Sequence, residues 1–265
     1  MTEIITSTKN PAVQRVRELL AQRKKRDQEN AYVIEGVRLA EEALAAKRSP
    51  SLVLFSQRIS ERGRALLQTV NSEHTRVEEV DADLLERLSD TNTSQGLLMV
   101  FERHARASIP FSDPVLVLDQ MRDPGNLGTI LRGAPAFGFK TVLLTPGSVD
   151  PYSPKVLRAA MGAHFKLHLE TRSAAEIRAL CHPGTSTDMR ILLADAQAEG
   201  SCWQTDLTQP LCLIIGGEAF GAQPDIQAIV DQNVLIPMQA NNESLNAAMA
   251  ASILMYEVFR QRNLK

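Results

Sequence analysis

Short apolar runs alternate with amphipathic segments along the first hundred residues. The runs at 31–36, 51–56 and 96–101 are rich in aliphatic residues and have the length of buried strands. Residues 37–46 place their apolar side chains at helical spacing instead. Because strand and helix patterns alternate, we predict a small α/β domain over residues 1–104.

A second alternation begins at Val115 and continues to the C-terminus. Near-continuous apolar runs of this kind are typical of parallel strands that are covered by helices on both faces. Five such runs occur, at 115–121, 141–146, 190–196, 211–217 and 234–238. Residues 105–113 are charged and then rich in Ser and Pro, without a period, so we predict a linker there. Residues 114–265 are therefore expected to form a second α/β domain.

Composition narrows the possible partners and locations. The 265 residues carry a formal net charge of −2, so an RNA partner would have to be held by local basic patches. No apolar run is long enough to span a membrane and no secretion leader is visible, which predicts a cytoplasmic protein. Its three cysteines lack the paired spacing of metal ligands, so we expect reduced thiols and no metal.

Three of the predicted strands end in loops that are rich in glycine or polar residues, at 122–138, 218–224 and 239–246. Ligands bind at the carboxyl ends of strands in an open parallel sheet, so these loops predict a small-molecule site. The third loop holds more amide, carboxylate and hydroxyl groups than one helix cap needs. Neither a dinucleotide fingerprint nor a P-loop fits, since Phe139 stands where the P-loop lysine is required.

The segments 126–132, 216–221 and 236–262 resemble, in order and spacing, the three motifs of the SpoU/TrmH family of RNA 2′-O-ribose methyltransferases, in the SPOUT superfamily. Residues 6–39 are similar to the family's substrate-binding domain. The resemblance implies an N-terminal ribosomal-protein-like α/β domain and a C-terminal α/β domain with a trefoil knot. It also implies bound S-adenosylmethionine and a homodimer.

One departure from the family pattern lies directly after the first motif. Gly133 and Pro135 stand where the family more often has Thr and Asp. Because proline lacks an N–H group and clashes with the preceding turn, we expect Pro135 to interrupt the helix there.

The resemblance makes Arg132 essential, and the family proposal gives this arginine the role of general base. A guanidinium keeps its proton far above neutral pH, so it is a poor base. Orienting a phosphate through paired hydrogen bonds is easier to defend, and an ordinary surface ion pair is the alternative.

Four more residues are predicted to be catalytic by the same resemblance. Asn126 either caps its helix or also touches RNA or Arg132, and Glu218 is either a solvated carboxylate or a functional one. Ser244 and Asn246 are expected to order the catalytic loop and the ribose.

The predicted cofactor contacts act largely through backbone groups that recognise adenine. Two of them, Met238 and Leu245, would fit equally well in the hydrophobic core. The full set is Thr145, Gly216, Gly217, Ile236, Met238 and Leu245.

A basic run in the first domain is the candidate RNA contact. It would supply the local positive charge that the whole chain lacks, although a charge run is also typical of a plain solvated helix face. The candidate residues are Arg15, Arg23, Lys24, Lys25 and Arg26.

We therefore predict an S-adenosylmethionine-dependent methyltransferase that acts on a ribose of structured RNA, with 23S ribosomal RNA preferred because of the separate N-terminal domain. The alternatives are a transfer RNA enzyme, a catalytically silent RNA-binding or ribosome assembly factor, and a nucleotide-dependent oxidoreductase.

In the last predicted helix, Met249, Ile253 and Tyr256 continue a stripe of apolar side chains that begins at Leu245. This stripe could face a second subunit or the core. The modified nucleotide and the biological purpose are left open.

Overall fold

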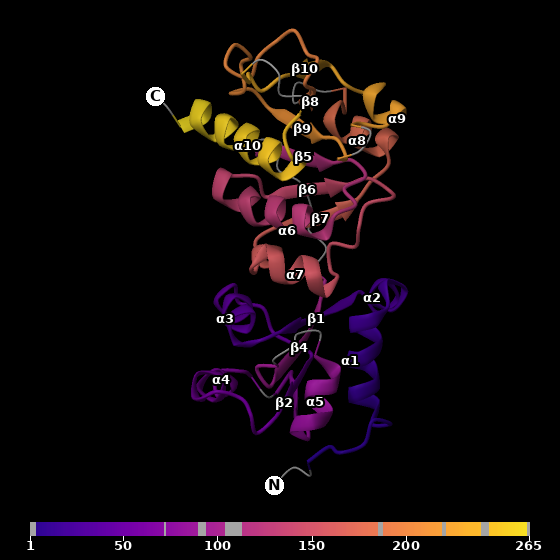
Figure 1. Cartoon of the computed structure of the whole chain (residues 1–265), viewed down its shortest axis with the longest axis vertical. Coiled ribbons are helices and arrows are strands. Elements are labelled where there is room, and N and C mark those ends of the chain that lie inside the picture. The colour runs from indigo at the N-terminus through magenta and orange to yellow at the C-terminus, as the bar shows by residue number, and fades with distance from the viewer. Residues whose placement is uncertain are drawn as a thin grey trace. The chain divides into compact units, whose positions relative to one another are not determined.

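The computed structural model divides into two compact units, which are described separately (Figure 1). The first comprises Met1–His104 together with Tyr152–Phe165, and the second comprises Ala105–Pro151 together with Lys166–Lys265. Residues 105–112 of the predicted linker lie outside the described part of the chain. The structure describes residues 4–71, 73–89, 94–103, 113–184, 188–218, 221–239 and 244–263.

The first unit is built on a four-stranded sheet with the order β1-β4-β2-β3. The central strand β4 runs antiparallel to both of its neighbours, whereas β2 and β3 are parallel. The strands are β1 (Ala31–Glu35), β2 (Leu52–Phe55), β3 (Arg76–Glu79) and β4 (Leu97–Glu102).

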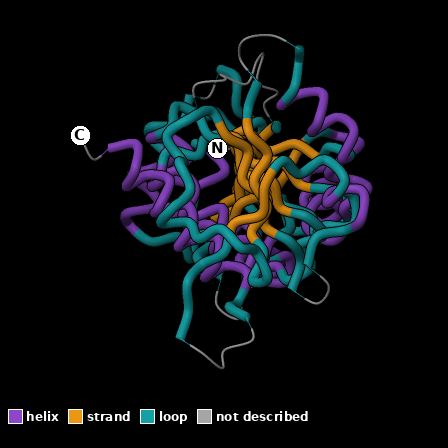
Figure 2. Tube along the Cα trace, turned by 90° about the horizontal axis from the view of Figure 1, so that it is seen from above, coloured by secondary structure: helices purple, strands orange, loops and turns teal. Residues whose placement is uncertain are grey.

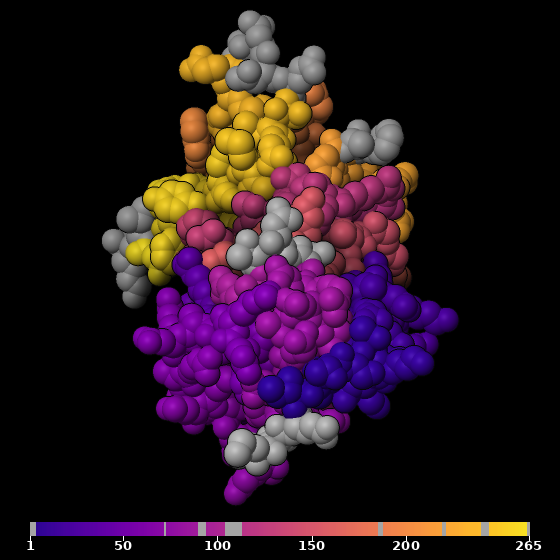
Figure 3. Space-filling model, turned by 60° about the horizontal axis from the view of Figure 1, so that its bottom comes forward, coloured from indigo at the N-terminus to yellow at the C-terminus, as the bar shows by residue number. Residues whose placement is uncertain are grey.

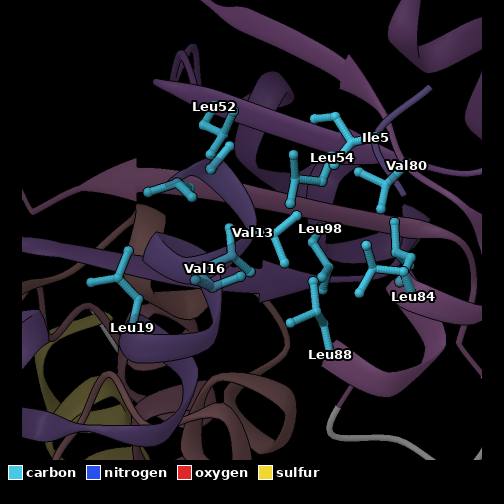
Figure 4. Packing of buried hydrophobic residues seen from close by; sticks show 14 of the residues in the cluster. Ile5, Val13, Val16, Leu19, Leu52, Leu54, Val80, Leu84, Leu88 and Leu98 are labelled. Atoms are coloured by element: carbon cyan, nitrogen blue, oxygen red, sulfur yellow. The ribbon is translucent and has the colours of Figure 1, made fainter. Parts of the chain in front are cut away.

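Helices cover both faces of this sheet. Helix α1 (Pro11–Ala21) and helix α5 (Ala82–Leu88) pack on one face, where Leu54 and Leu98 belong to their core (Figure 4). The alternate residues Val53 and Met99 point to the other face, because successive side chains of a strand alternate. The elements on that face include α3 (Val37–Ala45), α4 (Glu61–Leu67) and α7 (Pro154–Ala160).

Aromatic residues from two distant parts of the sequence complete this second core. The ring of Tyr152 lies 5.0 Å from that of Tyr32, and the ring of Phe165 lies 5.7 Å from that of Phe101. The Arg103 guanidinium stands 4.2 Å above the Tyr152 ring centre, in cation–π geometry. A segment from the second half of the sequence, including α7 and the 3₁₀ turn η2 (Ala163–Phe165), thereby belongs to the first unit.

The second unit contains a six-stranded, all-parallel sheet with the order β10-β8-β9-β5-β6-β7. This confirms the parallel sheet that the apolar runs predicted. The strands are β5 (Val115–Leu118), β6 (Thr141–Leu144), β7 (His168–Thr171), β8 (Arg190–Ala194), β9 (Leu211–Ile215) and β10 (Gln232–Val234).

Two layers of helices enclose this sheet, so that the strands lie inside (Figures 1 and 2). Helices α8 (Ala174–Cys181) and α9 (Pro224–Gln227) pack on one face. Helices α6 (Pro124–Gly133) and α10 (Ala247–Asn263) lie side by side on the other.

Pro135 interrupts the helix after the first motif, as expected. Helix α6 ends at Gly133, and the chain continues as a 3₁₀ turn, η1 (Ala134–Phe137), with Pro135 near its start. Arg132 therefore remains in the last turn of a regular α-helix. In the described part of the chain, no helix has the length and apolarity that a membrane crossing requires.

Arg26 of the basic run is a structural residue of the first unit. Its side chain follows α1 in the short helix α2 (Arg23–Glu29) and is only 4% exposed. Its Nη1 group donates to the carbonyl oxygens of Leu19 at 2.5 Å and Leu20 at 3.0 Å. These carbonyls lie in the last turn of α1, where carbonyl groups have no backbone N–H partner within the same helix.

We predict that Arg26→Met lowers the free energy of unfolding by about 2 kcal/mol, because it leaves buried helix carbonyls without a charged donor. The exposed neighbour Lys24 provides the control, and Lys24→Met should change the stability by less than about 0.5 kcal/mol. Urea unfolding followed by circular dichroism measures both. Equal effects of the two substitutions would contradict the capping role.

Candidate active site

The strands β5, β8, β9 and β10 end at the same edge of the second sheet. Their register pairs Leu118 with Ile215, and Val234 with Ala194. The loops that follow these strands are therefore neighbours in space, although they are far apart in sequence. This is the arrangement predicted for the ligand site of a parallel sheet.

A cavity of about 460 Å³ opens between these loops. Apolar side chains from the segment after β10 line it, together with the glycines after β9 and the start of α10. Five of the six predicted cofactor contacts are among the lining residues. These five are Gly216, Gly217, Ile236, Met238 and Leu245.

Backbone passes close to two of these glycines, and at Gly216 it leaves no room for a side chain. A Cβ atom on Gly216 would lie 2.6 Å from the nitrogen of Ala222 and from the carbonyl carbon of Gly221. On Gly217 it would lie 3.0 Å from the carbonyl oxygen of Gln120. The loop is closed by two hydrogen bonds of 3.1 Å between the backbones of Gly217 and Gly221.

A chain of side-chain hydrogen bonds joins all three predicted loops. Asn246 donates through Nδ2 to Oδ1 of Asn126 at 3.1 Å, and Asn126 donates through Nδ2 to Oε1 of Glu218 at 2.9 Å. Three of the residues predicted to be catalytic are thus in direct contact. These hydrogen bonds also fix which way each amide group points, because each amide nitrogen must face an acceptor oxygen.

Helix caps hold two members of this chain, Asn246 at its end and Asn126 in its middle. Asn246 also caps the start of α10, where its Oδ1 accepts from the backbone nitrogens of Ala248 at 2.9 Å and Met249 at 3.2 Å. Helix α6 is capped by Asp123, whose Oδ1 accepts from the backbone nitrogen of Asn126 at 2.7 Å. The suggestion that Asn126 caps this helix is therefore wrong, and its amide serves Glu218 and Asn246 instead.

The two remaining catalytic candidates are placed differently. Ser244 lines the cavity, and its hydroxyl has no hydrogen bond to a described residue. Arg132 is exposed on α6, does not line the cavity, and makes no ion pair or hydrogen bond within the described ranges.

Thr145 does not reach the cavity and belongs to a buried network beneath the loops. Its hydroxyl donates to Oδ1 of Asp119 at 2.5 Å and accepts from the backbone nitrogen of Gln120 at 2.9 Å. Oδ2 of Asp119 accepts from the backbone nitrogen of Gln223 at 2.7 Å. Thr145 thus supports the site instead of lining it.

Sequence reasoning overlooked two carboxylates at strand ends. Asp119 follows β5 and is 1% exposed. Asp195 follows β8 and lines the cavity, while its Oδ2 accepts from Nδ2 of Asn233 at 2.9 Å. Both could have been found, because an acidic residue directly after a buried parallel strand faces the ligand edge of the sheet.

The predicted RNA-binding cations are largely engaged within the first unit. Arg15 contacts Glu29 at 2.7 Å, and Lys25 bridges Glu29 at 3.1 Å and Glu18 at 2.9 Å. Burial raises the pKa of Glu29, but the hydrogen bonds from Arg15 and Lys25 outweigh it and hold the pKa below its ordinary value.

The other members of the run differ in their contacts. Arg23 lies 3.6 Å from Asp27, and Arg26 caps α1 as described above. Lys24 is exposed and has no ion pair in the described part of the chain. No group of three or more potential metal ligands occurs among the described residues.

Comparisons with known proteins agree with this geometry. Residues 113–256 match the model of the SpoU rRNA Methylase family, and residues 10–99 match the MRM3-like substrate binding domain. An uncharacterized tRNA/rRNA methyltransferase of Synechocystis is 32% identical, over 97% of this chain and 94% of its own length.

Two further similarities concern Streptomyces viridochromogenes. Its 23S rRNA (uridine(2479)-2′-O)-methyltransferase is 30% identical, over 97% of this chain and 92% of that protein. The crystal structure of its SpoU methyltransferase AviRb, in complex with the cofactor AdoMet, superposes with a TM-score of 0.84 at 28% identity. That alignment covers 96% of this chain and 99% of the other.

Two substitutions at Asn246 separate its cap from its contact with Asn126. Asn246→Ala removes both and should lower the free energy of unfolding by about 1 kcal/mol. Asn246→Asp keeps an oxygen for the α10 cap, so its stability should stay within about 0.5 kcal/mol of the original chain. Urea unfolding of the three proteins tests this, and equal losses for Asp and Ala would show that the cap contributes nothing.

Proposed function

Because the chain belongs to the SpoU rRNA Methylase family, we propose that it transfers the methyl group of S-adenosylmethionine to a ribose 2′-hydroxyl of large-subunit ribosomal RNA. The observation that carries this proposal is the hydrogen-bonded chain Glu218–Asn126–Asn246 beside the cavity. Support for ribosomal RNA comes from the N-terminal match to a substrate binding domain and from the 23S rRNA enzyme of Streptomyces viridochromogenes.

The cavity residues suit this cofactor. Ile236, Met238 and Leu245 offer apolar contacts for adenine, and the backbone at Gly216 and Gly217 offers polar groups for its edge. The Asp195 carboxylate is an acceptor for ribose hydroxyls. When bound, S-adenosylmethionine supplies a methyl group on a positively charged sulfur.

Positioning is the main task of the protein in such a displacement, since the acceptor oxygen must approach the methyl group in line. Asn126 and Asn246 are oriented by their own hydrogen bonds, so their positions are set before RNA binds. Glu218 keeps a second carboxylate oxygen for which no hydrogen bond to a described residue is present, and this oxygen can accept from the 2′-hydroxyl. Arg132 orients an RNA phosphate through paired hydrogen bonds.

In our proposal, Arg132 of one subunit acts at the cavity of a second copy of the chain. Four large apolar residues of α10, the helix that packs against α6, are exposed: Met249 at 56%, Ile253 at 38%, Tyr256 at 53% and Phe259 at 38%. Helix α10 forms part of the molecular surface, coloured yellow in Figure 3. Burying this stripe against its symmetry mate would form a dimer and bring Arg132 of the partner subunit to the cavity.

The reaction is tested with unmodified 23S rRNA transcripts and radiolabelled S-adenosylmethionine. We expect a 2′-O-methyl group at a defined nucleotide, and we expect Arg132→Ala to lower kcat on the order of 10²-fold. Arg178 is the matched control, because it is also an exposed arginine in the last turn of a helix, on the opposite face of the sheet. Arg178→Ala should keep full activity. Calorimetric binding of NAD in place of S-adenosylmethionine, with no methyl transfer, would refute the proposal.

The shared site is tested by mixing Arg132→Ala chains with Asn246→Ala chains under conditions of subunit exchange. Each protein alone should be nearly inactive. If the two residues act from different subunits, a heterodimer has one site with both substitutions and one intact site, so half of the activity per heterodimer returns. Failure to recover activity despite demonstrated exchange would rule out the shared site.

A further inference from the structure

A second cavity, of about 390 Å³, lies next to the first in the same unit. The two share Gly217, Glu218 and Gly221, so the catalytic carboxylate stands in their common wall. The other lining side chains come from two loops and include Gln120, Arg122 and Gln223. None of these three was singled out by the family motifs.

Gln120 is held in a conformation that L-residues rarely adopt. Its φ is 46°, in the left-handed region, and its backbone nitrogen is fixed by the Thr145 hydroxyl. Strained residues persist where surrounding structure over-determines them, and they cluster at functional sites. In this orientation Oε1 of Gln120 accepts from Nη2 of Arg122 at 2.7 Å, which places the guanidinium at the cavity.

The buried Asp119 carboxylate links the two loops that line this cavity. One oxygen holds the Thr145 hydroxyl, which positions Gln120, and the other holds the backbone nitrogen of Gln223. The side-chain amide of Gln223 makes no hydrogen bond to a described residue. The cavity wall thus presents an amide that has no hydrogen-bond partner among the described residues, on a backbone that is fixed from beneath.

The groups around this cavity match a neutral ligand with both donors and acceptors. Gln223 offers both, Arg122 offers donors, and Glu218 offers acceptors. A bare phosphate fits less well, because the carboxylates of Asp123 and Glu218 also line the space. The hydrogen-bonding edge of an unstacked nucleobase has this mixed character, and RNA-binding proteins recognise such bases in pockets.

We propose that this second cavity binds the nucleobase of the nucleotide whose ribose is methylated. Gln223 and the Gln120–Arg122 pair determine which base is accepted, and Glu218 in the shared wall lies between base and cofactor. The inference rests on the proposed ribose methylation and adds residues that select its substrate.

The test uses four versions of the 23S rRNA transcript that differ only in the base at the mapped acceptor position. For each RNA, kcat/KM is measured with the original chain and with Gln223→Ala and Gln120→Gly. Glycine tolerates the φ of residue 120, so the second variant removes the side chain without backbone strain. Gln197→Ala is the control, because Gln197 is an exposed glutamine of the same unit outside this cavity.

We expect the preference for the native base over the other three to fall roughly tenfold in both cavity variants and to stay unchanged in the control. Comparing proteins on the same RNA cancels any effect of the base on RNA folding. Affinity for S-adenosylmethionine, measured by calorimetry, should not change.

The inference is overturned if both variants slow all four RNAs equally, if neither changes the preference, or if the original chain accepts all four bases alike. In each of these cases methylation itself is still observed, so the proposed function stands. If the original chain methylates no rRNA ribose, the proposed function fails, and the inference fails with it.

Discussion

The site depends on the hydrogen-bonded chain that runs from Glu218 through Asn126 to Asn246. Its members are separated by 92 and 120 residues in sequence, so each bond closes a long stretch of chain. Closing such long stretches lowers the conformational entropy of the chain. The parallel sheet reduces this loss at the site, because its paired strands already bring the three loops to one edge. The side chains then select one arrangement among the loops.

Two helices are capped where this chain meets them, one by its member Asn246 and one by Asp123, which accepts from the backbone of Asn126. Asn246 caps α10 and Asp123 caps α6, so the positions of these neighbouring helices and of the polar groups are coupled. Beneath them, Asp119 ties the end of β5 to Gln223. A buried carboxylate with two donors is stable only in this one geometry, because a lost partner would leave a buried charge unpaired. Rigid support of this kind keeps catalytic groups in position before a ligand arrives.

Two parts of the surface that the sequence singled out differ in whether their side chains already have partners within the described part of the chain. Arg132 is exposed beside the apolar stripe of α10, and Phe137 extends that stripe through an edge contact with Tyr256 at 5.9 Å. The basic run of the first unit is different, since most of its cations already have acidic or carbonyl partners. Electrostatic attraction for RNA from this run is therefore weaker than its composition suggests.

The sequence by itself determined the α/β class, the parallel sheet and the loops at its carboxyl edge, because these follow from local periodicity and from glycine and polar residues at strand ends. Resemblance to a family identified Asn126, Glu218 and Asn246, which the structure brings together. Only the tertiary structure decided that Thr145 supports the site from beneath, that Asp123 caps α6, and that residues 152–165 complete the core of the first unit. The reason is physical: burial and the choice of hydrogen-bond partner depend on groups that are distant in sequence, and no local pattern records them.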